Sequence, residues 1–347
     1  MKNFFFTVLA LLFFINSQAQ FGGRNTYDFL NLPVSARVAA LGGNSIAIND
    51  GDINLVHFNP ALINGQMANN LNLSYINYFS DIGFGYVSYS NRFKKGFYNA
   101  GMQYINYGKF TKADANGDIT GEFTAGEYAF NTAYAQQLPY LDSSISVGAN
   151  VKFLYSTFEQ YQSFGLASDL GAIYFNPKYK LGLALTLMNV GTQISTFDKG
   201  NREPLPFKAQ IGVSKQFTKA PIRFSLVYEN LQRFNLTYLD TINVKTNSIT
   251  GEKEIQTIPF YDKLLRHFVV GAEVFPTKNL FFRAGFNYRR RQELKVTTRP
   301  GTVGLSWGIG FRISKFHLSY GRAIYHLAGP SNHITITTNL SSFSRSN

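Results

Sequence analysis

The serine at position 306 lies in a stretch whose residue types could perform nucleophilic chemistry. Residues 304–308 read GLSWG, which fits the G-x-S-x-G pattern of hydrolases. A nucleophile elbow needs a strained strand-to-helix turn, and its serine needs a histidine and an acid as partners. Ser306 instead lies in the middle of an alternating stretch, and no Asp–His pair can be assigned to it. We therefore interpret Ser306 as a small residue within a strand.

The histidines and the remaining motifs give no catalytic or metal-binding pattern. None of the histidines has H-x-x-H or H-E-x-x-H spacing, and no phosphate-binding loop or dinucleotide fingerprint occurs. The histidines are His57, His267, His317, His326 and His333. We therefore expect a protein that is not an enzyme and has no catalytic residue, metal or cofactor.

Alternation with a period of two is the dominant pattern of the chain. From residue 302 to residue 313, large apolar residues occupy every second position. The positions between them hold threonine, serine, three glycines and Arg312. Similar runs occur at residues 144–155, 267–274 and 280–289. This period predicts strands rather than helices.

About fourteen such strands are expected after Asn70. Most have about ten residues or more, which is enough for a tilted strand to cross the hydrocarbon of a membrane. Their expected ranges are Leu71–Phe79, Ile82–Asn91, Phe97–Tyr107, Ala125–Gln137, Ser144–Thr157, Ser163–Phe175, Tyr179–Val190, Leu205–Phe217, Pro221–Asn230, Leu264–Phe275, Asn279–Tyr288, Gly301–Ile313, Lys315–Ile324 and Asn332–Leu340.

The connections alternate between short turns and longer loops. The longer ones, at residues 108–124, 191–204, 231–263 and 289–300, follow odd-numbered strands. This is the pattern of an outer-membrane barrel with turns on one side and loops on the other. We therefore expect an all-β transmembrane antiparallel barrel of about fourteen strands, with the apolar face toward lipid and Arg312 toward the lumen. A soluble β-sandwich is the alternative.

The first residues predict export. Residues 1–19 have a lysine, an apolar run and small residues before Ala19, which is typical of a signal peptide cleaved near that residue. Residues 20–70 do not alternate and are expected to form an N-terminal hatch or plug segment. The barrel then spans residues 71–340, and residues 341–347 form a C-terminal tail. The chain has no cysteine, so disulfides cannot stabilise it.

The net charge is +13. For an exported protein this charge favours lipopolysaccharide or an acidic partner protein over nucleic acid. Scattered charge on solvated loops is the alternative.

Two stretches of the N-terminal segment carry a resemblance to a known family. They are YDFLNLPVSARVAALGGNSIAI at residues 27–48 and DGDINLVHFNPALI at residues 50–63. These stretches resemble the N-terminal region of FadL-like barrels, and more closely their PorV and PorQ relatives in the type IX secretion system of Bacteroidota. The matching residues are Leu32, Pro33, Ala36, Arg37, Gly42, Gly43, Asn59 and Pro60, with Ala61 after them.

The resemblance implies a fold and two functions. FadL-like barrels carry a hatch in the lumen and move hydrophobic molecules through a lateral opening. PorQ-type barrels are thought to anchor a PorZ-like surface protein, beside a PorU sortase and a PorV shuttle, in the complex that attaches cargo to lipopolysaccharide. The resemblance therefore implies a non-enzymatic anchor of this attachment complex, with a transporter of hydrophobic small molecules as the alternative. A transporter needs an apolar passage, whereas an anchor can be blocked.

Several polar residues are expected to form particular contacts. Arg37 needs a carboxylate if it lies in a lumen, and Asp50, Asp52 or a lumenal glutamate could supply it; an ordinary surface arginine is the alternative. Glu273 and Arg283 are expected to face each other across a hairpin as a lumenal ion pair.

The loops carry the remaining expectations. Arg289, Arg290 and Arg291 could bind lipopolysaccharide phosphates, or they could be solvated charges. Residues 231–263 are expected to form an external hairpin that contacts a partner. Within this loop, Asp240-Thr241-Ile242 resembles a short O-glycosylation pattern.

Overall fold

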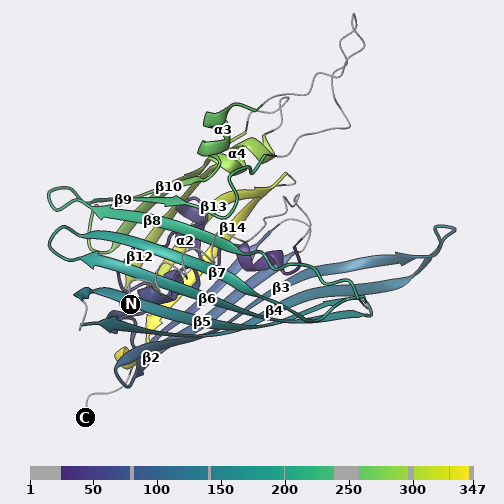
Figure 1. Ribbon diagram of the computed structural model, residues 1–347, viewed down its shortest axis with the longest axis horizontal. Helices are drawn as coiled ribbons and strands as arrows, with labels where there is room; N and C mark the ends of the chain where they lie inside the picture. Colours follow the sequence, from purple (N-terminus) through teal and green to yellow (C-terminus); the bar gives the residue numbers. More distant parts are fainter. Residues whose placement is uncertain are drawn as a thin grey trace, which may run out of the picture.

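The computed structural model describes residues 25–78, 82–139, 142–198, 200–237, 258–295, 301–327 and 329–343. Within these residues, fourteen strands form one closed antiparallel barrel, in which each strand pairs with the next and β1 pairs with β14 (Figure 1). This confirms the expected fold class. The predicted signal peptide at residues 1–19 and the predicted modification at Thr241 lie outside the described residues.

The strands agree with those expected from the sequence, apart from their ends. Every expected strand has its counterpart in the described part of the chain. Their bounds are β1 Asn70–Asn77, β2 Gly83–Phe93, β3 Gly96–Ala113, β4 Ile119–Leu138, β5 Asp142–Phe158, β6 Tyr161–Asn176, β7 Leu181–Ser195, β8 Lys208–Gln216, β9 Ile222–Tyr228, β10 Phe268–Val274, β11 Leu280–Asn287, β12 Leu305–Ile313, β13 Phe316–His326 and β14 Gly329–Asn339.

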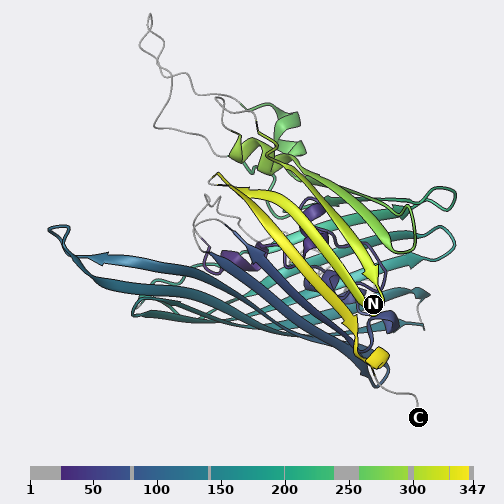
Figure 2. The same cartoon turned by 180° about the vertical axis from the view of Figure 1, so that it is seen from behind.

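The two ends of the barrel differ. Short turns such as residues 94–95 and 314–315 lie at one end, which we call the turn end, together with the start of β1 and the end of β14. The longer connections lie at the other end, the loop end. Figure 2 shows β13 and β14, in yellow, beside the dark strands that begin the barrel.

The barrel wall is higher on one side than on the other. Strands β3 to β7 have 15 to 20 residues, whereas β8 to β11 have seven to nine. The connection at residues 108–124, which was expected to be a loop, is instead mostly strand. There Phe110 pairs with Phe123, and their rings stack at 5.2 Å. As a result, β3 and β4 project as a hairpin beyond the rest of the rim (Figure 1).

Two short helices replace parts of the expected loops. Helix α4 (Tyr288–Leu294) occupies the start of the 289–300 connection, and the side chain of Asn287 caps it by accepting from the Arg290 backbone N–H. Helix α3 (Phe260–Leu265) overlaps the end of the 231–263 connection. The expected hairpin within that connection falls mainly on residues 238–257, outside the described residues.

The alternation in the sequence separates the two faces of the wall. On β12, the side chains of Leu305, Trp307 and Ile313 are more than half exposed on the outer face, while Ser306 is buried on the inner face. An apolar outer band is the arrangement that a lipid-facing barrel requires. Among the described residues, no helix has the length and apolar character to cross a membrane.

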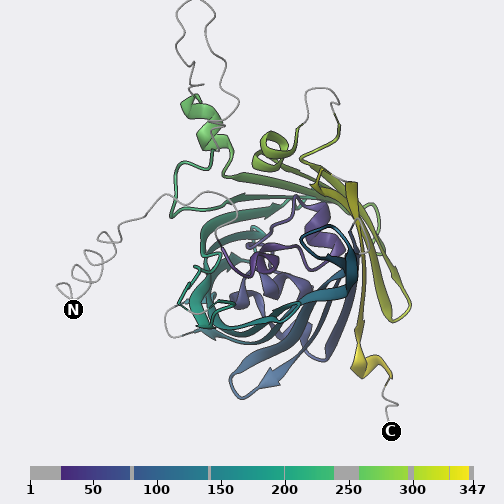
Figure 3. The same ribbon diagram turned by 90° about the vertical axis from the view of Figure 1, so that its right-hand side faces the viewer.

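Residues 25–69, which we call the lumenal segment, lie inside the barrel (Figure 3). Tyr27 bonds to Ser163 near the loop end, whereas Asn70 begins β1 at the turn end, so the segment passes down the lumen. Its short helices are η2 Asp28–Asn31, α2 Ala36–Ala40, η3 Ile53–His57, η4 Pro60–Leu62 and η5 Gly65–Met67. Most of its apolar side chains, including Leu41 and Leu62, are buried in one cluster with wall residues such as Phe84, and Val56, Ile63 and Met67 are buried in a second cluster against β4.

Inward-facing glycines of the wall let the lumenal segment approach closely. A Cβ at Gly285 would lie 2.1 Å from the backbone nitrogen of Gly42, and one at Gly321 would lie 2.3 Å from the carbonyl oxygen of Ala36. Real Cβ atoms do not approach backbone this closely. The glycines between the apolar residues of these strands therefore form the surface on which α2 packs.

Candidate functional site in the barrel lumen

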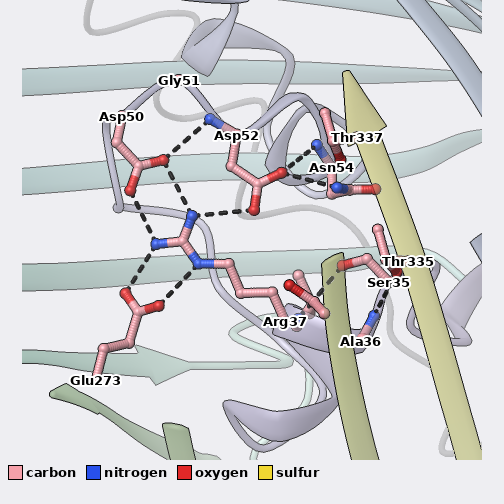
Figure 4. Close-up of polar contacts among 12 residues, drawn as sticks. Ser35, Ala36, Arg37, Asp50, Gly51, Asp52, Asn54, Glu273, Thr335 and Thr337 are labelled. Carbon is pink, nitrogen blue, oxygen red and sulfur yellow. Dashed lines mark hydrogen bonds and ion pairs between the residues drawn. The ribbon is translucent and has the colours of Figure 1, made fainter. Parts of the chain in front are cut away.

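Arg37 is the centre of a buried polar cluster between the lumenal segment and the wall (Figure 4). It lies in the first turn of α2, where the side chain of Ser35 accepts from the Val38 backbone N–H and fixes the start of the helix. The guanidinium donates to Asp50 at 2.8 Å and to Asp52 at 3.0 Å, both within the lumenal segment. The alternative of a surface arginine is therefore wrong.

The barrel wall completes the cluster. Arg37 donates to Glu273 on β10 through Nε at 2.9 Å and Nη2 at 2.8 Å. Glu273 also accepts from Arg283 Nε at 3.0 Å, and the two residues lie directly opposite each other in the β10–β11 register. Arg223 on β9 contacts both Asp50, at 2.7 Å, and Glu273, at 3.0 Å.

The cluster balances three guanidinium groups against three carboxylates. A buried charge is costly unless it is paired and hydrogen-bonded, and here each carboxylate has at least one arginine partner. Burial raises the pKa of Asp50, but Arg37 and Arg223 outweigh that effect and hold it below its ordinary value. Every guanidinium in the cluster has a carboxylate partner. We therefore interpret the cluster as a structural connection between the lumenal segment and the wall, and not as a catalytic site.

The Gly42-Gly43 turn is held by the wall at the end of α2. Both glycines have positive φ, 93° and 92°, which explains why this turn needs glycine. Ser306 Oγ accepts from the Gly42 backbone N–H and donates to the Ala40 carbonyl, each at 3.0 Å. Ser306 therefore binds the C-terminal end of α2 from the middle of a strand, as a structural residue and not a nucleophile.

The remaining residues of the N-terminal resemblance are also placed in the lumen. Asn59 Oδ1 accepts from the Ala61 backbone N–H at 2.9 Å, and its Nδ2 donates to the Ile46 carbonyl at 2.8 Å, so this residue fixes the turn before Pro60. The Ala36 backbone N–H donates to Thr335 Oγ1 at 2.9 Å. Pro33 is buried, and Leu32 packs against the main apolar cluster.

The basic triplet on α4 does not form one exposed patch. Arg290 points toward the lumenal segment, where its Nη2 donates to the Gly42 carbonyl at 3.1 Å. Arg291 donates to the Gly301 carbonyl at 2.6 Å, and Arg289 lies 3.7 Å from Glu293 on the same helix. Arg290 is therefore directed toward the lumen, where the Gly42 carbonyl accepts from it, and not toward a surface phosphate.

A cavity of about 450 Å³ opens at the turn end beside the Arg37 cluster. Four cationic side chains line it, together with Asp50 and Asp52 and three phenylalanines. The cations are Arg37, Arg283, Arg312 and Lys315. Arg312 faces the lumen side, as the alternation predicts. No group of His, Cys, Asp and Glu side chains that could hold a metal occurs among the described residues.

Sequence reasoning missed two buried contacts of the inner wall. Arg223 joins the Arg37 cluster, and Lys152 on β5 lies 2.8 Å from Asp169 on β6, with both side chains almost fully buried. The sequence does indicate that these cations are buried, because strand alternation places Arg223 and Lys152 on the inner face of the wall. The partners could not be named: the long connection between β9 and β10 leaves the register of Arg223 with Glu273 open, and Lys152 reaches Asp169 diagonally, because its direct neighbour on β6 is Ala167.

No family model and no curated protein matches the sequence. The solved structures do offer similar folds. The toluene transporter TodX of P. putida has 12% identity and a TM-score of 0.55, and the match covers 90% of this chain and 99% of that chain. The fold is similar to that of TodX. A TodX deltaS2S3 mutant, a monoaromatic hydrocarbon channel (13% identity, TM-score 0.49), covers 88% and 99%, and a FadL homologue of Pseudomonas aeruginosa (11% identity, TM-score 0.45) covers 88% and 98%.

The likeness to TodX agrees with the expected FadL-like architecture. The barrel fold is that of Gram-negative outer-membrane barrels. Identity this low bears on the fold alone.

Proposed function

We propose that this chain is an outer-membrane barrel of the FadL type that passes hydrophobic small molecules, with the lumenal segment as its gate. The observation that carries the proposal is the likeness to TodX, a toluene transporter, over nearly the whole of both chains. The lumenal segment supports it, because a barrel with a separate element inside its lumen can be opened by moving that element.

The gate is closed in the conformation described. The lumenal segment contacts the wall through the Arg37 cluster, through Ser306 and through the apolar cluster around Leu41. The cavity at the turn end is lined by charged groups, which do not suit an apolar passenger. Passage therefore requires the lumenal segment to shift from the wall.

A reversible disulfide tests the gate. The chain has no cysteine, so the pair Ala36→Cys and Thr335→Cys would be the only thiols, at residues joined by a 2.9 Å hydrogen bond. We expect cells that carry the wild type to take up labelled toluene faster than a deletion strain. The oxidised pair should block this uptake, and reduction should restore it.

A matched control places the crosslink outside the lumen. The pair Phe110→Cys and Phe123→Cys lies opposite in the projecting hairpin, so its disulfide should leave uptake unchanged. Equal toluene uptake with and without the gene would overturn the transport proposal. Unchanged uptake in the locked Ala36–Thr335 protein would exclude the lumenal segment as the gate.

A second function is favoured by the filled lumen and the projecting hairpin. We propose, as this second candidate, a non-enzymatic anchor for the type IX attachment complex, holding a PorZ-like surface protein beside PorU-type and PorV-type partners and lipopolysaccharide. An anchor can have a blocked lumen. The β3–β4 hairpin exposes Phe110 and Ile119, the latter at 76%, where a surface protein could reach them.

Deletion separates the two functions. If the anchor proposal holds, loss of the gene releases type IX cargo into the medium, and a variant whose residues 110–122 are replaced by a short turn reproduces this release. The truncated barrel should still shift on heating in detergent gels, which shows that it folds. Normal surface attachment of cargo in the deletion strain would rule out the anchor and leave the transport proposal intact.

A further inference from the structure

Helix α3 carries an exposed apolar face at the loop end, above strands β9 and β10 (Figure 1). Phe260 is 68% exposed, Tyr261 63% and Leu265 40%. Because successive residues of a helix turn by about 100°, these three lie on one side of α3 and Asp262 lies on the other. Large apolar side chains that are exposed together indicate an interaction surface.

The other side of α3 holds the helix in this orientation. Asp262 is buried, and its carboxylate accepts from Tyr288 Oη on α4 at 2.8 Å and from Arg266 Nε at 2.8 Å. Both carboxylate oxygens therefore have a donor. The apolar face is directed away from α4 by these bonds.

A series of ring contacts connects this face to the outer face of the wall. Tyr228, at the end of β9, lies on the same face as the exposed Leu226. The Tyr228 ring stacks on His267 at 4.7 Å. The ring of the half-exposed Phe234 lies 5.9 Å from His267 and 5.5 Å from Phe260. The exposed face of α3 is therefore continuous with the apolar outer band of the barrel.

The wall below α3 is too short to span the apolar layer of a membrane. Strands β9 and β10 have seven residues each, whereas a membrane-crossing strand needs about nine to eleven. At about 3.3 Å per residue and a tilt of about 40°, seven residues rise about 18 Å, against an apolar band about 25 Å tall. The outermost part of the apolar layer on this side therefore faces whatever follows β9 and precedes β10.

Helix α3 occupies this position. It directly precedes β10, and Figure 3 shows it, in green, outside the ring of strands and not over the lumen. A lipid therefore fits this face better than a molecule passing through the lumen does. Aromatic side chains are also favoured where the apolar layer meets the headgroups.

We propose that α3 lies in the outer leaflet of the membrane, with Phe260, Tyr261 and Leu265 among the acyl chains just below the headgroups. The helix thereby completes the lipid-facing band above the short strands β9 and β10. This role goes beyond both proposed functions and does not depend on which of them holds.

Quenching of tryptophan fluorescence by spin-labelled lipid tests the proposal. Trp307 is the single tryptophan of the chain and is 52% exposed on the outer face of β12, so the wild type gives the reference for lipid contact. The full-length barrel is placed in phosphatidylcholine vesicles that carry a spin label either near the headgroup or near the end of the acyl chain. In a Trp307→Phe background, Phe260→Trp should lose fluorescence to both labels, and more to the one near the headgroup.

Ile119→Trp in the same background is the matched control, because Ile119 is also apolar and exposed but lies at the far end of the projecting hairpin. It should lose no fluorescence to either label. Tyr261→Trp is a second probe of α3 if the Phe260 variant does not fold, and a heat shift in detergent gels shows which variants fold. Quenching in the α3 variants no stronger than in Ile119→Trp, as expected if a surface protein covers α3, would overturn the proposal.

Discussion

Arg37 and Glu273 are 236 positions apart in the chain, and they form a two-bond ion pair between the lumenal segment and strand β10. Glu273 is fully buried and Arg37 is 5% exposed, so the pair is shielded from water. The pair favours one placement of the segment, because any other placement would separate Arg37 from Glu273 and leave each of these buried charges with fewer partners.

Replacement of Arg37 by glutamine should destabilise the barrel by about 3–5 kcal/mol, because it leaves Glu273 and Asp50 with fewer partners in a buried site. Urea or thermal unfolding in detergent would measure this loss. Lys109→Gln removes an ion pair with Glu122 in the exposed hairpin and should have no measurable effect. Equal unfolding curves for wild type and Arg37→Gln would contradict the role given to the cluster.

Acid should weaken the packing of the lumenal segment through His57. Burial lowers the pKa of this histidine from 6.5 to about 3. Below 6.5 the unfolded chain takes up a proton that the folded chain does not accept until about pH 3, so stability falls as the pH falls through this window. Unfolding temperatures measured across the window should therefore drop less in His57→Gln than in the wild type.

Gly285→Ala should displace the lumenal segment. The added Cβ would lie 2.1 Å from Gly42 N and 2.3 Å from the Leu41 carbonyl carbon, and backbone atoms cannot rotate away. We expect a loss of about 1–3 kcal/mol and easier proteolysis within residues 25–69. Gly329→Ala meets nothing within 4 Å and serves as the control. A Gly285→Ala protein as stable and as protease-resistant as this control would mean that the wall does not fix the segment.

Ser306→Ala tests the interpretation of the G-x-S-x-G stretch. Loss of the hydroxyl leaves the Gly42 backbone N–H with only its longer bond to the Ala39 carbonyl, at 3.3 Å, and removes the donor to the Ala40 carbonyl, at a cost of about 1–3 kcal/mol in unfolding free energy. Hydrolysis of p-nitrophenyl acetate should stay at the background rate in both proteins. Ser143→Ala, at the exposed start of β5, controls for the loss of a hydroxyl. Wild-type esterase activity that disappears in Ser306→Ala would restore the hydrolase reading.

Much of the wall was predictable because alternation is a local property. The stretch around Trp307 shows its outward and inward faces in the sequence itself, and the inward position of Arg312 follows from it. The pairing of Glu273 with Arg283 also follows, since a hairpin fixes its own register. The carboxylate partners of Arg37 could be expected because a lumenal arginine requires them.

The errors have physical causes that lie outside local alternation. Residues 108–124 predict a loop because the regular alternation stops after Tyr107. There, pairs such as Phe110 with Phe123 extend the ladder. Helix α4 was missed although Asn287 is a good N-cap residue. The inward turn of Arg290 depends on Gly42, 248 positions away, and no sequence pattern reports such a contact.

The pairing of β1 with β14 constrains the order in which the barrel folds. These strands are the two ends of the barrel sequence, so their ladder forms only after all the others are available. Chains do not thread themselves through closed rings during folding. The lumenal segment must therefore pack against the open sheet before β1 and β14 pair. A mutation that slows this packing should delay closure of the barrel, even if it does not destabilise the folded protein.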